Sequence, residues 1–332
     1  MTYEEMEKAY RENFSEMSIT RDGIRYLKLR TLIDVETLRA SETLRSTFDI
    51  KISEIRRDLA EEIRKAAFLN KMISDDRIND LLREVYDGLK AFRGINFEGL
   101  KPSLSKIADE GDEHWNEWNS VYRDDIRQHI QHHFVRAVNV HSYEELLEKI
   151  SKELDPVVKG YTIISWFNQW SSAIIEQSIL SHTKVVPTAR RIDKVDFFFL
   201  DIPIDLKITF VPAEYIALSI KNGIISDRGQ IVEDIKNNPQ RLIKWLYENQ
   251  GESRFSDSHR LFIILADAKD LVKSWKLKAN FNLIQGVINN FLNSRCSKNE
   301  IPLVDWEFRG SRIHGQWRTY SDIILITKDQ RL

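Results

Sequence analysis

Two aspartates and a lysine stand inside apolar segments in the stretch KVDFFFLDIPIDLKITF, residues 194–210. Asp196 opens the first apolar run, and Asp205 and Lys207 alternate with isoleucine and leucine in the second. Alternate side chains of a strand point to opposite faces, so Asp205 and Lys207 are expected to share one face. Charges in such a position are normally paired, bound to a metal or solvated. The triplet alone also fits an ordinary two-faced strand with a solvated ion pair.

The spacing of Asp196 and Asp205 favours chemistry over a simple ion pair. They are nine positions apart, with a turn-like DIP sequence between them. If the two runs pair as antiparallel strands, Asp196 lies across from Asp205. Two close carboxylates repel each other unless a positive group lies between them, and Mg²⁺ suits that role because it takes one or two protein carboxylates. A neighbouring lysine could then orient or deprotonate the attacking water, or balance phosphate charge.

This segment resembles the catalytic core of the PD-(D/E)XK nuclease superfamily, the restriction-endonuclease-like fold. Its members share a helix, a hairpin that carries a first acid, a (D/E)-x-K triplet on the next strand, and then a helix and further strands. The resemblance implies Asp196 as the first acid and Asp205-Leu206-Lys207 as the triplet. It covers about 160–330 and is specific within 170–210. Two departures are that no proline precedes Asp196 and that the triplet has Asp where Glu is also common.

Many members of this superfamily add a glutamate from the helix before the hairpin, and Glu176 is well placed for that role. Glu176 falls opposite the main apolar stripe of the predicted helix, near Asn168 and Ser172. The stripe consists of Ile163, Trp166, Phe167, Trp170 and Ile174. A surface glutamate near a helix end is the other interpretation of this residue.

The elements around these residues divide the chain in two. Residues 1–155 are predicted to be helical. Helices are expected over 41–73, from Ser74 to Gly94, and from Ser142 onward. Ser142 and Glu145 have the spacing of a capping box. The stretch 94–120 is the least regular of this half and contains Pro102. We expect residues 1–155 to form a helical recognition or dimerisation domain.

The second part, residues 156–332, alternates helices with short apolar strands. Helices are predicted over 161–181, over 239–249 with Pro239 at its first position, and near 280–293; strands are predicted over 184–189, 194–200, 204–211, 260–267, 304–310 and 321–327. The predicted fold class is α+β or α/β. A restriction-endonuclease-like mixed β-sheet flanked by helices would form the nuclease domain.

Composition limits the alternatives. The 332-residue chain is 42% hydrophobic and 30% charged, as expected of a globular protein. It has one cysteine, Cys296, no apolar leader at its start, and no apolar run long enough to span a bilayer, so a cytoplasmic location without membrane partners is predicted. Residues 1–160 carry a formal charge near −6 and residues 161–332 one near +4. This distribution permits, without requiring, a polyanion partner for the second part.

Several basic residues are candidates for DNA contacts. The segment FRGSRIHGQWRTY (308–320) interleaves arginine and glutamine with glycine and tryptophan, and such side chains can contact phosphates or base edges. A solvated hairpin with scattered charges is the equal alternative. The candidate DNA-binding residues are Arg190, Arg191, Lys194, Arg309, Arg312, Gln316 and Arg318.

Other catalytic chemistries fit less well. His129 and His133 have the i, i+4 spacing of a zinc pair, but the glutamate of an HExxH motif is missing. No Gly-rich phosphate loop is present, and Cys296 has no evident partner for nucleophilic catalysis.

The resulting hypothesis is a Mg²⁺-dependent DNA endonuclease, most simply a type II restriction endonuclease acting on double-stranded DNA as a homodimer. Asp196 and Asp205 would ligate the metal, Glu176 would support a ligand water or second metal, and Lys207 would orient the water. The alternatives are a binding protein that keeps the fold without cleaving, and a repair or structure-specific nuclease without sequence preference.

Overall fold

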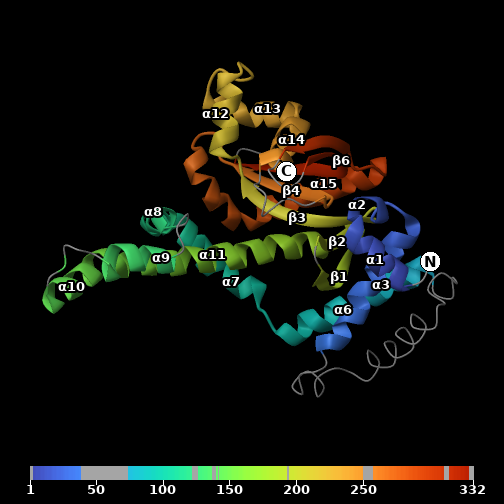
Figure 1. The fold of residues 1–332 in the computed structure, drawn as a ribbon, viewed down its shortest axis with the longest axis horizontal. Coiled ribbons are helices and arrows are strands. Elements are labelled where there is room, and N and C mark those ends of the chain that lie inside the picture. The colour runs from blue at the N-terminus through green and yellow to red at the C-terminus, as the bar shows by residue number, and fades with distance from the viewer. Residues whose placement is uncertain are drawn as a thin grey trace.

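The structure, a computed structural model, describes eight stretches of the chain (Figure 1). These are residues 3–38, 74–121, 126–136, 140, 142–192, 194–249, 257–309 and 314–328. The helix predicted over 41–73 lies outside the described residues. Within them, no helix combines the length and the apolar character needed to cross a membrane.

A six-stranded mixed sheet forms the centre of the molecule, with the strand order β1-β2-β3-β4-β6-β5. The strands are β1 (Val185–Ile192), β2 (Val195–Phe199), β3 (Ile202–Phe210), β4 (Arg260–Ala266), β5 (Leu303–Arg309) and β6 (His314–Thr327). The first three strands form an antiparallel meander. β4 lies parallel to both β3 and β6, and β5 pairs antiparallel with β6 at the edge. The sheet confirms the predicted α+β class.

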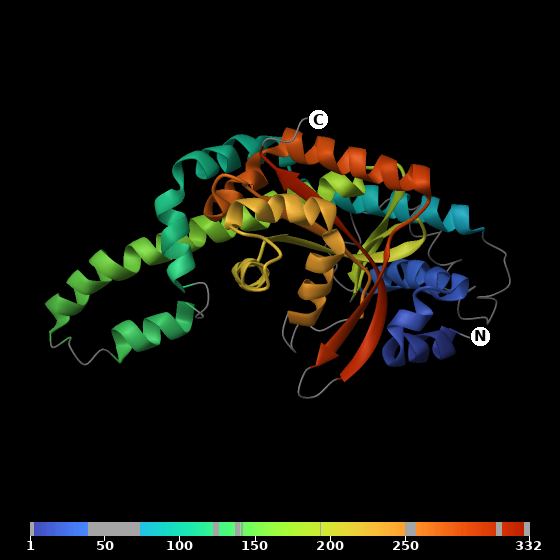
Figure 2. The same cartoon turned by 90° about the horizontal axis from the view of Figure 1, so that it is seen from above.

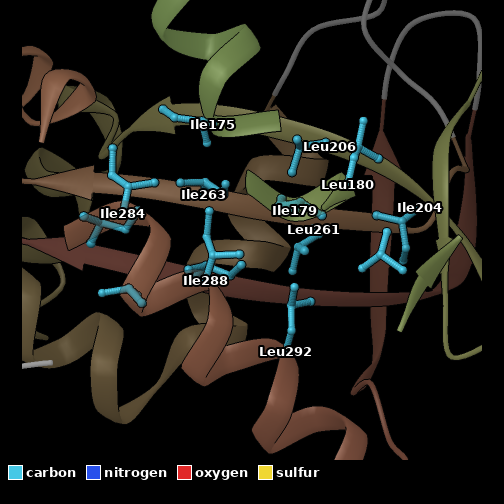
Figure 3. Close-up of a cluster of buried hydrophobic side chains, with 14 of the residues drawn as sticks. Ile175, Ile179, Leu180, Ile204, Leu206, Leu261, Ile263, Ile284, Ile288 and Leu292 are labelled. Atoms are coloured by element: carbon cyan, nitrogen blue, oxygen red, sulfur yellow. The ribbon is translucent and has the colours of Figure 1, made fainter. Parts of the chain in front are cut away.

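One face of the sheet packs against α11 (Asp155–Leu180) and α15 (Phe281–Lys298). Figure 3 shows this core, in which Ile175 and Ile179 of α11 and Ile288 of α15 lie over the strands. Leu206 of β3 and Leu261 of β4 point into it. Because side chains alternate along a strand, Asp205, Lys207 and Arg260 must point to the opposite face.

That opposite face is covered by two separate groups of helices. Residues of α12 (Ala213–Lys221), α13 (Ile231–Asn237) and α14 (Pro239–Asn249) pack on β4, β5 and β6. The N-terminal helices α1 (Tyr3–Glu12), α2 (Phe14–Met17), α3 (Arg21–Leu38) and α6 (Asp75–Arg93) pack on β1 and β2. Figure 1 shows α12 to α14 on the side of the sheet away from α11, with α1 and α3 beside β1 and β2. We call the boundary between these two groups of helices the seam. On the sheet it lies between Phe198, which packs under the N-terminal helices, and Phe262, which packs under α12 to α14.

The remaining helices extend α11 into an arm. α7 (Phe97–Glu110) and α8 (Asp112–Val121) pack along α11 and on the 3₁₀ segment η6 (Leu271–Ala279) around Phe167 and Trp275. α9 (Ile126–Ile130), η2 (Gln131–Val135), α10 (Tyr143–Lys149) and η3 (Ile150–Leu154) follow, and α10 lies at the far end of the arm (Figures 1 and 2). A short 3₁₀ turn, η4 (Arg228–Gln230), precedes α13.

Most predicted boundaries agree with the structure. α6 follows Ser74 and ends at Arg93, directly before Gly94, which has φ 58°. Ser142 Oγ accepts a hydrogen bond from the Glu145 N–H, as the capping box predicted. The prediction of an irregular stretch over 94–120 is wrong, because these residues form α7 and most of α8. Pro102 lies inside α7, where the burial of Leu104 and Ala108 stabilises the helix despite the proline. α11 begins at Asp155, and the division of the chain into two domains at 155 and 156 stays a prediction.

Candidate active site

β3 changes its pairing partner at the predicted triplet. Its pairing with β2 runs to Ile204, opposite Phe197, and its pairing with β4 begins at Asp205, opposite Arg260. The Asp205 N–H donates to the His259 carbonyl, on the β4 side. The next N–H, that of Leu206, points back toward β2 and donates to Asp196 Oδ2 at 2.8 Å. The two aspartates therefore lie together at the divergence of β2 and β3, as the nine-residue spacing predicted.

Asp205 is contacted by two cations. Lys207 Nζ donates to Asp205 Oδ1 at 2.6 Å, and Arg260 Nε donates to Asp205 Oδ2 at 3.3 Å. Ser258 Oγ contributes a longer contact to Oδ2, at 3.4 Å. Asp205 therefore links β3 to β4 in two ways. Its side chain accepts from Arg260, and its backbone N–H donates to the His259 carbonyl.

Lys207 is the most exposed charged side chain of the site. The side chains of Asp205 and Arg260 are 12% and 3% exposed, and that of Lys207 is 42% exposed. Asp196 is buried as well. On the same face, Phe198 belongs to the core under the N-terminal helices and Phe262 to the core under α12 to α14. The site therefore lies at the seam, and Lys207 reaches from it toward water.

The four residues before and at the start of β4, 257–260, hold the seam together. Tyr247 OH donates to the Ser258 carbonyl, and burial raises the pKa of this tyrosine to about 12. Tyr320 N–H donates to His259 Nδ1, so His259 Nε2 carries the proton and donates to Ser18 Oγ at 3.0 Å. Burial lowers the pKa of His259 to about 4, and this outweighs the nearby Asp257 carboxylate, which raises it.

Glu176 belongs to a different element from these residues. It is half-buried on α11, the helix that covers the face opposite to the one carrying Asp205 and Lys207. The described residues contain no group of three or more histidine, cysteine, aspartate or glutamate side chains placed to hold a metal ion, so Glu176 does not complete a three-carboxylate group. Of the predicted apolar stripe, Phe167 and Ile174 are buried, whereas Trp166 is 36% exposed. The buried face of α11 instead includes Ile175 and Ile179, so the helix phase could not show which sheet face the helix covers.

The predicted DNA-binding residues occupy different places. Lys194 Nζ donates to Asp257 Oδ1 at 2.6 Å, so it contributes to the seam. Gln316 is exposed on β6, and Arg318 forms a surface ion pair with Asp305 at 2.6 Å. The side chains of Arg190, Arg191 and Arg309, and the whole of Arg312, lie outside the described part of the chain.

The histidine pair of residues 127–133 lies on the arm. His129 lies near the end of α9 and His133 lies in η2. The centroids of their rings are 4.6 Å apart. Their proximity follows from the i, i+4 spacing.

Arg260 and Ser258 are the site residues that the sequence did not reveal. Arg260 precedes the apolar run LFIILA, just as Asp196 opens the run FFFL, and a charge at the start of a buried strand is a usable signal. What the sequence could not supply is the parallel register that places Arg260 opposite Asp205.

The pair Asp196 and Asp205 has the donor chemistry for one Mg²⁺ ion. Both are buried oxygen ligands on neighbouring strands, and Mg²⁺ completes its shell with water and substrate phosphate. The residues therefore fit the ion in type and number. Lys207 and Arg260 already neutralise Asp205, however, so an ion would have to replace at least one of these contacts.

Comparison of the chain with protein-family models, with curated proteins and with solved structures gave no match.

Proposed function

We propose that this protein is a Mg²⁺-dependent DNA endonuclease of the PD-(D/E)XK type. The observation that carries the proposal is the divergence of β2 and β3 with Asp196 on one strand and Asp205-Leu206-Lys207 on the other, fixed by the hydrogen bond from Leu206 N–H to Asp196. The antiparallel meander β1-β2-β3, followed by helices and a parallel β4, supports the restriction-endonuclease-like fold as part of this proposal.

In this proposal each residue has a distinct task. Asp196 and Asp205 provide carboxylate oxygens for the ion, and the Leu206 N–H fixes the orientation of Asp196. Bound Mg²⁺ would polarise the scissile phosphate and acidify a coordinated water. Lys207, the most exposed charge of the site, would orient the attacking water and balance charge on the phosphate in the transition state.

Double-stranded DNA is the proposed substrate, and a homodimer is the proposed assembly because one site cuts one strand. The cytoplasm is the proposed location, since a lone cysteine suits a reducing compartment. A type II restriction enzyme is the specific form we propose.

A second candidate is a binding protein that keeps this fold without cleaving. The contacts of Lys207 and Arg260 with Asp205 favour it, because a carboxylate held by two cations has less affinity for a third. The two candidates differ in a single measurable property, which is cleavage.

The test is incubation of the purified protein with plasmid DNA in the presence of Mg²⁺ or Mn²⁺. Discrete fragments are expected for a restriction enzyme, and a smear would indicate a nuclease without sequence preference. Asp205→Asn and Lys207→Ala should each reduce the rate by about 100-fold or more. Asp322→Asn is the matched control, because Asp322 is a buried, arginine-paired aspartate of β6 outside the site. Absence of cleavage with either ion, or full activity of Asp205→Asn, would overturn the catalytic assignment.

A further inference from the structure

Arg260 is the most buried charge of the site and is held from several directions. Its Nε donates to Asp205 Oδ2, and its guanidinium lies 4.9 Å from the ring centroid of Tyr247. The Tyr247 ring in turn stacks on Trp306, with centroids 4.6 Å apart. The backbone carbonyl of Arg260 accepts from Ser321 Oγ. The guanidinium therefore has a fixed position beside Asp205, and it stays charged because arginine does not lose its proton in proteins.

Lys207 and Arg260 differ in their freedom to leave Asp205. The Lys207 side chain is flexible and 42% exposed, so its ammonium can move into water when another ligand arrives. Arg260 is 3% exposed and packed on Tyr247, so it cannot swing out without opening the cover formed by α14. A divalent ion at Asp205 Oδ2 would lie close to a fixed positive charge, and like charges at such distances repel strongly in a buried site.

We infer that Arg260 is an internal cation of the candidate active site, which neutralises Asp205 in the absence of a divalent ion and competes with that ion for Oδ2. The inference rests on the proposed function, because it concerns the same carboxylates. Arg260 would act through Asp205, without contacting the substrate. Its contact with Asp205 would lower the affinity of the site for a divalent ion.

The readout is the affinity for Mn²⁺, used in place of Mg²⁺ and measured by isothermal titration calorimetry on the full chain without DNA. Arg260→Gln removes the charge and should tighten Mn²⁺ binding on the order of tenfold, which corresponds to the loss of one charged contact that the ion must displace. Arg260→Lys keeps a positive charge and should bind Mn²⁺ about as the unmodified protein does. Asp205→Asn should abolish the binding in either background.

The matched control is Arg295→Gln. Arg295 forms an ion pair of 2.6 Å with buried Asp322, and both belong to the packing of α15 on β6, away from the seam. It should leave Mn²⁺ affinity unchanged. Unchanged or weaker affinity in Arg260→Gln would overturn the inference, and so would equal tightening in Arg260→Gln and Arg295→Gln. Circular dichroism establishes that each variant is folded; if Arg260→Gln is not, Arg260→Met keeps an apolar stem over Tyr247 and removes the same charge.

The outcomes also separate the inference from the proposed function. DNA cleavage by the unmodified protein together with unchanged Mn²⁺ affinity in Arg260→Gln would refute the inference alone. Mn²⁺ binding by Arg260→Gln but not by the unmodified protein would support the inference and favour the non-cleaving candidate. No Mn²⁺ binding by either protein would refute both the inference and the metal-dependent function.

Discussion

Asp205 joins two cations that differ in exposure, and this difference predicts how each contact contributes to stability. The Lys207 side chain is 42% exposed, whereas that of Arg260 is buried. An exposed ion pair contributes little to the free energy of unfolding, while the loss of one member of a buried pair leaves an uncompensated charge in a low-dielectric environment. The contributions of the two cations should therefore be unequal.

We expect Asp205→Ala to lower the free energy of unfolding by about 3 to 5 kcal/mol, because it takes from buried Arg260 the carboxylate to which its Nε donates. Lys207→Ala should lower it by about 1 kcal/mol or less. Urea unfolding followed by circular dichroism measures both. Similar small losses in the two variants would show that Arg260 does not depend on Asp205.

His259 gives the seam a dependence on pH. Its pKa is lowered to about 4 in the folded protein, from an ordinary value of 6.5. Between these values the unfolded chain binds a proton that the folded protein does not, so stability should fall as the pH decreases from about 6.5 to about 4. Protonation of His259 Nδ1 would remove the acceptor of the Tyr320 N–H and leave two N–H groups facing each other.

The loss through this one histidine should be at most about 3 kcal/mol. Stability curves against pH for the unmodified protein and for His259→Gln test this expectation. The free energy of unfolding of the unmodified protein, relative to that of the variant, should stay constant above about pH 6.5 and decrease as the pH falls from there to about 4. A constant difference between the two curves over pH 4 to 7 would contradict it.

The sequence predicted part of this site because part of it is local. Asp196 and Asp205 belong to one hairpin, so their spacing sufficed to place them together. Ser258, His259 and Arg260 lie just before and at the start of β4, far along the chain beyond α12, α13 and α14, and no local spacing encodes that approach. For Glu176 the sequence predicted the helix, α11, but helix phase alone could not show which face of the sheet this helix covers, and its role in the site stays a prediction.

α2, the shortest α-helix among the described residues, lies at the seam. Phe14 of α2 is 1% exposed and lies within ring-contact distance of Tyr10 and His259. The ammonium of Lys194 lies 5.0 Å from its ring centroid. A four-residue helix is not stable by itself, so its position depends on this buried ring.

Phe14→Ala should therefore lower the free energy of unfolding by about 3 to 5 kcal/mol through lost burial and the cavity left behind. Ile19→Ala is the comparison, because Ile19 follows α2 closely and is 55% exposed; its effect should stay within about 0.5 kcal/mol. Chemical denaturation measures both variants. Equal effects would indicate that α2 does not anchor the N-terminal helices to the sheet.

At the level of elements, apolar runs and caps predicted β2 to β4, α6, α10 and α14, since these signals are local. The β6 strand is longer than predicted because its first half, His314–Tyr320, pairs only with β5, and this polar half lacks the apolar run that marks the second half. α7 and α8 were missed because their stability comes from packing on α11 and η6.

Across the whole molecule, burial is concentrated in the sheet and declines along the arm. Every residue of β4 is buried, and the strand is paired on both sides. α10 and η3 have no buried residues, and Tyr143 and Leu147 of α10 are exposed. Backbone amides with few buried contacts open with little free energy.

Hydrogen–deuterium exchange followed by mass spectrometry should therefore show much slower exchange in peptides covering β4 than in peptides covering α10. The difference should reach several orders of magnitude, because opening of β4 requires unfolding of the central sheet. Protection of α10 equal to that of β4 would mean that the arm is covered by a partner, such as the second copy of the proposed homodimer.

The change of partner in β3 has a consequence for the chain while it is being synthesised. Asp205 and its contacts Ser258 and Arg260 are separated by 53 and 55 positions. At about 5 to 20 residues per second, the ribosome releases both acids several seconds before it releases the arginine. During that interval the hairpin of β2 and β3 can pair, yet Asp205 lacks the guanidinium that later contacts it. Cations of the surrounding solution are its available counter-charges in place of that guanidinium until β4 is made.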